Sequence, residues 1–224
     1  MMTISPIAHF HSPLTSKFGI PRQSGIADTL HGTIVFTPQH RNIDAMRGLE
    51  GFDYLWIIWG FSENVDTEKH ATVRPPRLGG NKRVGVFATR PPFRPNNLGL
   101  SSVRIIKIDI GTTEGPVIEV AGADLMDGTP IYDIKPYLPE FDSHPGVRAG
   151  FVGSNEWKPL EVCFLPSADI GIFSPADVQT ITQLLSQDPR PHYHSSPDRI
   201  YGMPYNGRDI RFRVVDGRVE VVGV

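Results

Sequence analysis

The chain has 224 residues and a formal net charge of −2, from 22 basic and 24 acidic residues. This length suits one large domain or a large and a small one, and no apolar run approaches the roughly 20 residues of a membrane helix. The single cysteine, Cys163, excludes an intrachain disulfide and any multi-cysteine metal site, and its apolar neighbours indicate a buried thiol. The N-terminus shows no secretory signal, so we expect a soluble cytoplasmic protein.

The first part of the chain alternates short apolar runs with turn signals, which is typical of an all-β sandwich or barrel. A short helix is expected at 42–49, where Asn42 can serve as the N-cap. The fold class is therefore mainly β, with a β-barrel over residues 1–143. The strands that we expect lie at 4–10, 32–36, 54–61, 83–89, 100–110, 117–120 and 131–134.

A shift in composition within residues 141–157 places the domain boundary after residue 143. Residues 144–224 are predicted to form a small α+β domain. Its helix begins with Ser174 as N-cap and a proline at the first helical position, and it ends before Pro189. The other elements expected there are a strand at 161–165 and two strands about the Asp216-Gly217 turn.

Several common chemistries leave no trace in the sequence. There is no glycine fingerprint between a strand and a helix and no GxxxxGK[ST] loop, which argues against ordinary nucleotide folds. There is no GxSxG elbow, which argues against covalent hydrolysis. The histidine pairs at 9/11 and 192/194 lack a carboxylate at a standard ligand spacing, so no metal site is predicted.

Residues 72–102 form a basic stretch that holds six cations and no acid. Prolines and glycines interrupt it, so we expect a shaped loop that can carry function. The cations alternate with Phe87 and Phe93 rather than with acidic partners. Arginines beside aromatic rings suit phosphate contact and base stacking, so RNA or another polyphosphate is the ligand class that the residues favour over a merely solvated face.

Two other segments could touch a ligand. Pro21-Arg22-Gln23 lies in a long loop without regular structure, and a rigid φ followed by a cation and an amide suits a polar ligand. An exposed turn explains the same residues equally well. Ser62 and Glu63 follow a strand end, where side chains of barrels can meet ligands or simply begin a loop.

Six segments of the chain resemble the TsaA-like family of bacterial tRNA methyltransferases known as TrmO. The resemblance implies a β-barrel with a small C-terminal domain, a homodimer, and methylation by S-adenosylmethionine of N6 of threonylcarbamoyladenosine beside the anticodon. The matching segments are PRQ at 21, AMRGLEGFDYLWIIW at 45, TVRPPRLGG at 72, GVFATRPPFRPNNLGLS at 85, DLMDGTPIYDIKPYLP at 124 and QDPRPHY at 187.

The resemblance also implies site residues. Ser62-Glu63 departs from the His-Gln found in related sequences, so backbone contacts are expected at that point. The cofactor-binding residues implied are Pro21, Arg22, Gln23, Ser62, Glu63, Arg90, Leu100, Asp127, Gly128, Thr129 and Pro130. The other cations of the basic stretch are assigned to RNA contacts: Arg74, Arg77, Lys82, Arg83 and Arg94.

The expected reaction transfers a methyl group from a positive sulfonium to a nitrogen that is a poor nucleophile. Asp127 and Glu63 are hypothesised to stabilise the bound cation, and a general base would help the proton to leave, but no catalytic residue is identified. Residues 188–191 have two interpretations, a helix stop or a contact with the site across the dimer. The alternative function is a non-catalytic RNA- or nucleotide-binding barrel.

Overall fold

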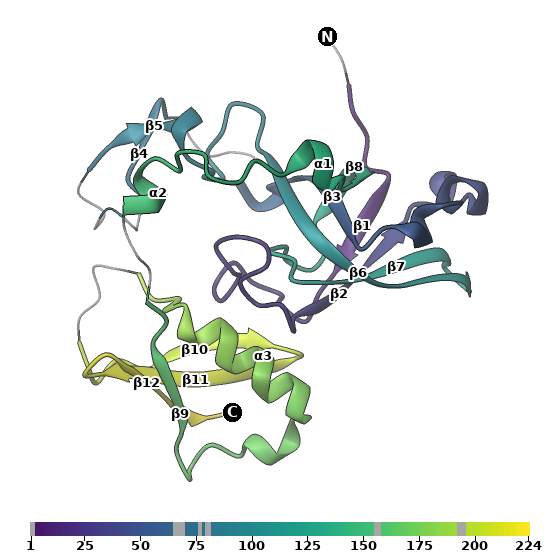
Figure 1. The fold of residues 1–224 in the computed structure, drawn as a ribbon. Helices are drawn as coiled ribbons and strands as arrows, with labels where there is room; N and C mark the ends of the chain where they lie inside the picture. Colours follow the sequence, from purple (N-terminus) through teal and green to yellow (C-terminus); the bar gives the residue numbers. More distant parts are fainter. Residues whose placement is uncertain (1–2, 65–69, 76–77, 79–81, 155–157, 192–195) are drawn as a thin grey trace.

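The computed structural model describes residues 3–64, 70–75, 78, 82–154, 158–191 and 196–224 (Figure 1). Six antiparallel strands close into a barrel in the order β1-β2-β7-β6-β3-β8, which confirms the prediction of a mainly β chain with a barrel. The barrel strands are β1 (Ala8–His11), β2 (His31–Phe36), β3 (Tyr54–Gly60), β6 (Leu98–Thr112), β7 (Gly115–Ala121) and β8 (Pro130–Pro136).

A smaller unit follows the barrel, built from a four-stranded sheet in the order β10-β11-β12-β9 with helix α3 packed on it (Figure 1). Strand β9 runs parallel to β12, and the other pairs are antiparallel. No helix among the described residues is long and apolar enough to cross a membrane. The elements are β9 (Glu161–Phe164), α3 (Pro175–Ser186), β10 (Tyr201–Tyr205), β11 (Arg208–Val215) and β12 (Arg218–Gly223).

Short elements lie between the barrel strands and between the two units. The two-stranded sheet β4 (Thr72–Val73) and β5 (Val84–Gly85) lies in the basic stretch, and α1 (Pro139–Asp142) and α2 (Phe151–Ser154) lie between the barrel and β9. Turns of 3-10 helix cover 38–40, 43–46, 49–51, 62–64, 86–88 and 170–172.

The barrel core follows from the alternation of its strands. In β2 every second residue is buried, so Ile34 and Phe36 face inward while the residues between them are more exposed. Gly32 occupies the third inward position, where a Cβ would lie 2.2 Å from the Phe10 ring. Glycine there lets the Phe10 ring of the neighbouring strand cross the barrel interior, which fixes how β1 and β2 pack.

The long loop between β1 and β2 joins the two units. Its Leu14, Ala27 and Leu30 are buried in the core formed by α3 and the C-terminal sheet. Thr29 exchanges hydrogen bonds with Thr180 and Gln183 of α3, at 2.9 and 2.7 Å. The loop has no regular structure, as expected from its composition, but it is fixed by packing on the second core.

Two predicted elements differ from the structure, and one strand was not predicted. Residues 42–49 do not form an α-helix, because Arg47 is extended and Gly48 has φ 88°, so only a 3-10 turn follows the Asn42 cap. The strand expected at 83–89 is reduced to β5, because β4 offers it only two residues to pair with. Strand β10 was not predicted; it contains Pro204, which an edge strand tolerates.

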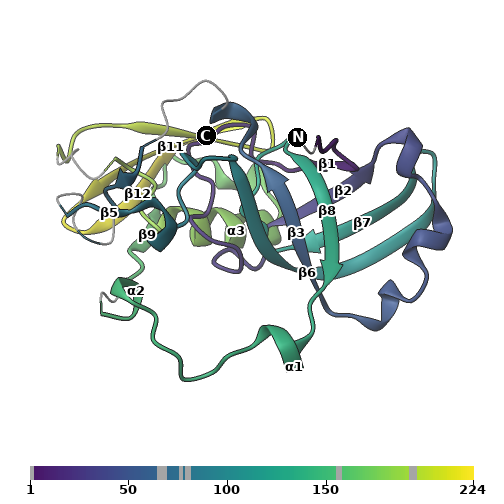
Figure 2. The same cartoon turned by 90° about the horizontal axis from the view of Figure 1, so that it is seen from above.

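Between α1, whose Asp142 carboxylate accepts from the Trp56 indole N–H of β3 at 3.0 Å, and α2, the chain runs as a wide arch (Figure 2). Residues 138–150 are all exposed. Among them Phe141 and Val147 are large apolar side chains with 67% and 68% of their surface exposed. Apolar residues on a segment that projects from the fold are candidates for contact with another molecule.

Helix α3 begins with a complete capping box. The Ser174 hydroxyl accepts from the Asp177 N–H at 3.1 Å, and the Asp177 carboxylate accepts from the Ser174 N–H at 3.2 Å. The other carboxylate oxygen accepts from the Tyr205 hydroxyl at 2.8 Å, which ties the helix to β10. The hydrogen bond from the Ser174 hydroxyl is the main reason that the pKa of Asp177 lies below its usual value.

We expect Ser174→Ala to lower the free energy of unfolding by about 1 kcal/mol, the usual value of such a cap. A lowered aspartate pKa stabilises the fold above the ordinary value and loses this effect as Asp177 becomes protonated. The difference between the variant and the parent should therefore shrink when the pH falls below about 4. Urea unfolding between pH 3 and 7 measures it, with the exposed Ser143→Ala as control; an equal decrease in both variants would contradict the assignment.

Candidate active site

A pocket of about 190 Å³ opens at the end of the barrel where β3 ends and β6 begins. Most of its wall is apolar or aromatic, and a small number of polar groups converge on it, which is the usual composition of a ligand site. Two carboxylates and one ammonium group are among these polar groups. The lining residues are Lys17, Ile20, Trp59, Gly60, Phe61, Ser62, Glu63, Asn64, Pro92, Asp124, Met126 and Thr129.

The end of β3 supplies the aromatic wall. Trp59 and Phe61 pack with ring centroids 4.3 Å apart, and Trp59 is almost fully buried. The indole lies across Gly99 of β6, where a Cβ would come within 2.3 Å of the ring. Its N–H can therefore reach over the neighbouring strand and donate to the Ser101 hydroxyl at 2.9 Å. Glycine at position 99 is what permits this crossing.

Asp124 accepts the hydrogen bond that follows the one from Trp59 to Ser101. The Ser101 hydroxyl donates to the Asp124 Oδ1 at 2.5 Å. Burial raises the pKa of the Asp124 carboxyl above its usual value, while hydrogen bonds from Ser101 and from backbone N–H groups and the charge of Arg90 act in the opposite direction. The pocket thus contains a carboxyl group that is desolvated and surrounded by donors.

The loop between β1 and β2 forms the opposite side of the pocket. Lys17 donates to the Glu63 carbonyl and to the Asn64 Oδ1, both at 2.7 Å, so it joins this loop to the end of β3. Gln23 accepts from the Arg90 guanidinium at 2.8 Å and donates to the Arg22 carbonyl at 2.6 Å. The first predicted segment and the basic stretch are therefore brought together.

The same loop also contacts the C-terminal unit. The Arg22 guanidinium donates to the Asp188 carbonyl at 3.1 Å, and the Asp188 carboxylate pairs with Arg190 at 2.8 Å. Asp188 has φ 48°, a conformation that ends α3 and turns the chain. Residues 188–190 thus end the helix and also lie against Arg22 within one chain, so a helix stop and a contact near the site are compatible.

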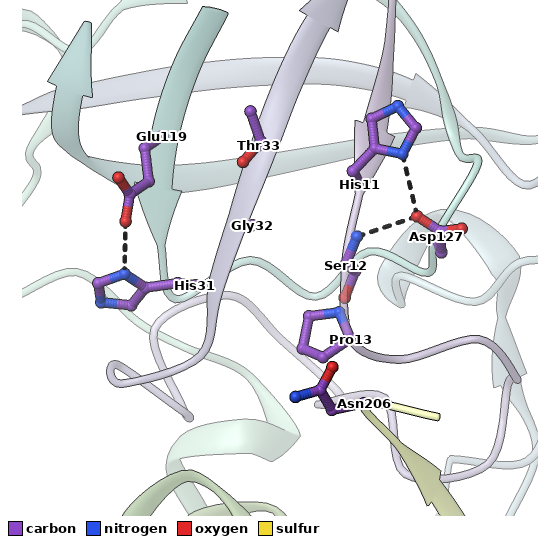
Figure 3. A pocket seen from close by; sticks show the side chains of 9 residues that line it. All are labelled: His11, Ser12, Pro13, His31, Gly32, Thr33, Glu119, Asp127 and Asn206. Carbon is purple, nitrogen blue, oxygen red and sulfur yellow. Dashed lines mark hydrogen bonds and ion pairs between the residues drawn. The ribbon is translucent and has the colours of Figure 1, made fainter. Parts of the chain in front are cut away.

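The turn before β8 divides the remaining predicted residues between two pockets. Gly128 has φ 76°, which places it in a tight turn closed by a bond from the Thr129 N–H to the Met126 carbonyl at 3.2 Å. Thr129 lines the first pocket, whereas the Asp127 carboxylate points into another, where it accepts from the Ser12 N–H and lies 3.3 Å from His11 (Figure 3).

This second pocket, of about 370 Å³, lies where β1 and β2 approach the turn between β10 and β11 (Figure 3). Its other ion pair joins His31 to Glu119 at 2.8 Å. Asn206 contributes from the C-terminal unit, and its N–H donates to the Pro13 carbonyl at 2.9 Å. Among the described residues that line it, most are polar and the only aromatic rings are those of the two histidines.

The predicted cofactor residues are therefore not all in one place. Ser62, Glu63 and Thr129 line the first pocket, and Gln23 and Arg90 meet beside it. Three others lie elsewhere or have a structural position: Pro21 is buried in the loop between β1 and β2, Pro130 begins β8, and Leu100 lies on the outer face of β6 with 55% of its surface exposed.

The cations assigned to RNA fall into distinct settings. Arg74 and Lys82 are exposed. Arg83 is exposed and donates to the Thr72 hydroxyl at 2.9 Å. Arg94 instead braces its own loop, donating to the carbonyls of residues 86 and 89 at 3.2 and 2.8 Å. Arg77 lies outside the described residues.

Sequence reasoning missed several residues of the first pocket, of which Asp124 and Lys17 carry charge. The apolar run AGADLM around Asp124 could have indicated a functional residue, since an aspartate is rarely buried unless it has a polar partner. Nothing local marked Lys17. Within the described residues, no group of three or more His, Cys, Asp or Glu side chains is arranged to hold a metal ion.

Both units match family models. Residues 9–143 match the tRNA-methyltransferase O N-terminal domain, and residues 158–224 match the TrmO C-terminal domain. The tRNA (adenine(37)-N6)-methyltransferase of Escherichia coli K12 is 36% identical over 222 residues, which cover 96% of this chain and 94% of that protein. A Pseudomonas aeruginosa protein named as a putative S-adenosylmethionine-dependent methyltransferase, RcsF, is 36% identical over 208 residues, 90% of this chain and 87% of that one.

Solved structures agree with these matches. The crystal structure of TrmO from Pseudomonas aeruginosa superposes with a TM-score of 0.78 at 28% identity, covering 99% of this chain and 96% of that chain. Because the family models account for both the barrel and the C-terminal unit, the resemblance is not confined to one motif. The chain belongs to the TrmO family of tRNA methyltransferases.

Proposed function

We propose that this protein transfers a methyl group from S-adenosylmethionine to N6 of the adenosine at position 37 of tRNA. The observation that carries the proposal is the pocket at the barrel mouth, where an aromatic wall faces a half-buried carboxyl in a chain that matches the family over both units. The Escherichia coli relative is named for methylation of N6 of adenine 37 in tRNA, and the Pseudomonas aeruginosa relative is named as a putative S-adenosylmethionine-dependent methyltransferase.

The residues present in the pocket fit this cofactor. Aromatic and thioether side chains, Trp59, Phe61 and Met126, offer surfaces to an adenine ring and to a sulfonium. Glu63 offers negative charge near a positive sulfur. S-adenosylmethionine supplies the electrophilic methyl group when bound, and the protein supplies orientation, which can contribute about 7–11 kcal/mol to lowering a barrier.

The RNA is proposed to be tRNA that carries threonylcarbamoyladenosine, and the site of action is the cytoplasm, where such tRNA is used. The exposed Arg74, Lys82 and Arg83 lie in the same basic stretch as Arg90, which contacts Gln23 beside the pocket. Phosphate contacts on this side would place a base near the pocket mouth. Phe87, with 80% of its surface exposed, is available for stacking on a base.

A homodimer is part of the proposal. Three apolar side chains of the segment from α1 to α2, those of Phe141, Val147 and Val152, have 67%, 68% and 45% of their surface exposed. Apolar side chains on a projecting segment are better explained by a partner than by solvent. A second copy of the chain is the partner proposed for this surface.

Nucleoside mass spectrometry of tRNA, after incubation with the protein and S-adenosylmethionine, tests the activity. We expect a mass increase of one methyl group on threonylcarbamoyladenosine. Arg90→Ala should reduce the rate by at least about tenfold, because it removes the hydrogen bond that positions Gln23 and a charge near Asp124. Arg47→Ala, an exposed arginine paired with Asp44, is the matched control. No methylation by the parent protein would refute the function.

The RNA-binding role of the exposed cations is tested by the salt dependence of tRNA binding. Replacing both Arg74 and Lys82 with alanine should weaken binding and reduce the slope of log affinity against log salt by about 1 for each phosphate that the protein no longer neutralises. Binding of S-adenosylmethionine should not change. Alanine at Arg47 and Lys107, two exposed cations already paired with carboxylates, provides the control. An unchanged slope in the first variant would remove these residues from the interface.

Light scattering after gel filtration tests the dimer. The parent protein should have twice the chain mass, and Phe141→Arg with Val147→Arg should shift it to the monomer, because two charges cannot be buried in an apolar contact without a large cost. Ile43→Arg replaces another exposed apolar residue, outside the arch, and should leave the mass unchanged. A monomeric parent protein would contradict the proposal.

A further inference from the structure

The first pocket holds one carboxyl group, that of Asp124, to which no contact with the cofactor has been assigned. Of the two acidic side chains that line it, Glu63 is exposed, and its backbone carbonyl, not its carboxylate, is held by Lys17. Asp124 is enclosed by protein and opens to the pocket. A carboxyl group that lines a pocket in a desolvated setting is a candidate for proton transfer.

The hydrogen bonds around Asp124 fix its orientation. The indole N–H of Trp59 can only donate, so the Ser101 oxygen must accept from it. The single hydroxyl hydrogen of Ser101 is then directed at the Asp124 Oδ1. Asp124 is therefore held as an acceptor on one oxygen, by a residue that is itself held by a buried ring.

The charges facing Asp124 come from three segments. Arg90 acts on it from the basic stretch. Lys17 and Glu63 line the same pocket, and the Lys17 ammonium already bonds to the Glu63 carbonyl and to the Asn64 side chain. The charge of Arg90 opposes the effect of burial on the pKa of Asp124 and so favours the ionised carboxylate, which can receive a proton.

The geometry points to Asp124 as the proton acceptor in methyl transfer, an inference that rests on the proposed function. The N6 nitrogen forms a bond to the methyl carbon as the bond from that carbon to sulfur breaks, and the bonding pair stays on sulfur. The N6–H bond breaks, its pair remains on nitrogen, and its proton passes to a carboxylate oxygen of Asp124. The proton later leaves to solvent, which returns the carboxylate.

The environment suits this role. A general base works best when its pKa lies near the working pH, and burial moves the pKa of Asp124 upward in that direction. The N6 nitrogen is conjugated and gains nucleophilicity only as its proton leaves. Removing such a base typically costs about 10²–10⁴ in rate.

Single-turnover methylation of tRNA measured against pH tests the inference. In the parent protein, the rate should rise with pH through one step, as Asp124 becomes ionised. Asp124→Asn should reduce the rate by about 10²–10⁴ and abolish the step, while calorimetry shows unchanged binding of S-adenosylmethionine. Asp133→Asn, which removes an exposed barrel carboxylate paired with Lys135, should keep both the rate and the step.

A second variant separates chemistry from folding. The hydrogen bond from Ser101 lowers the pKa of Asp124, so Ser101→Ala should move the step to higher pH. A merely structural role would not move it. An active parent protein whose step is unaffected by both variants would overturn the assignment of Asp124, whereas an inactive parent protein would instead refute the function on which it rests.

Discussion

The first pocket depends on the loop between β1 and β2. This loop connects two barrel strands, but its apolar side chains are buried in the core of the C-terminal unit. Leu14 and Leu30 flank the segment between β1 and β2 and are both buried against α3 and the C-terminal sheet. Burying a leucine side chain contributes about 1.5–3 kcal/mol. These two residues hold Lys17 and Gln23 at the barrel mouth, so the second unit positions a pocket whose described lining residues all come from the first unit. Substitutions in that core can therefore alter the site from a distance.

The barrel supplies a rigid chain of hydrogen bonds that leads to the pocket. Trp59 reaches across Gly99 to Ser101, and Ser101 reaches Asp124. Each member is on a strand or soon follows one, so side-chain freedom is restricted by packing. A group that must receive a proton at a defined place benefits from such support, because small errors of position cost large factors in rate.

The cations of the basic stretch have different partners and therefore different roles. Arg94 is used by carbonyl groups of its own loop, and Arg90 is directed to Gln23. Arg74 and Lys82 remain exposed. Charge density along the sequence therefore overstates the cations available to RNA, because guanidinium groups also serve as multiple donors that hold irregular backbone in place.

The sequence by itself determined the strands with strong alternation, the Ser174 cap and the mainly β class, because these depend on neighbours within a few residues. It also carried the motifs that bring Gln23, Ser62, Arg90 and Thr129 to one end of the barrel. Only the tertiary structure decided that Asp127 and Thr129 face different pockets, that β10 forms an edge strand despite its proline, and that Asp124 is desolvated. Burial and direction arise from packing between residues far apart in the chain, which local pattern does not encode.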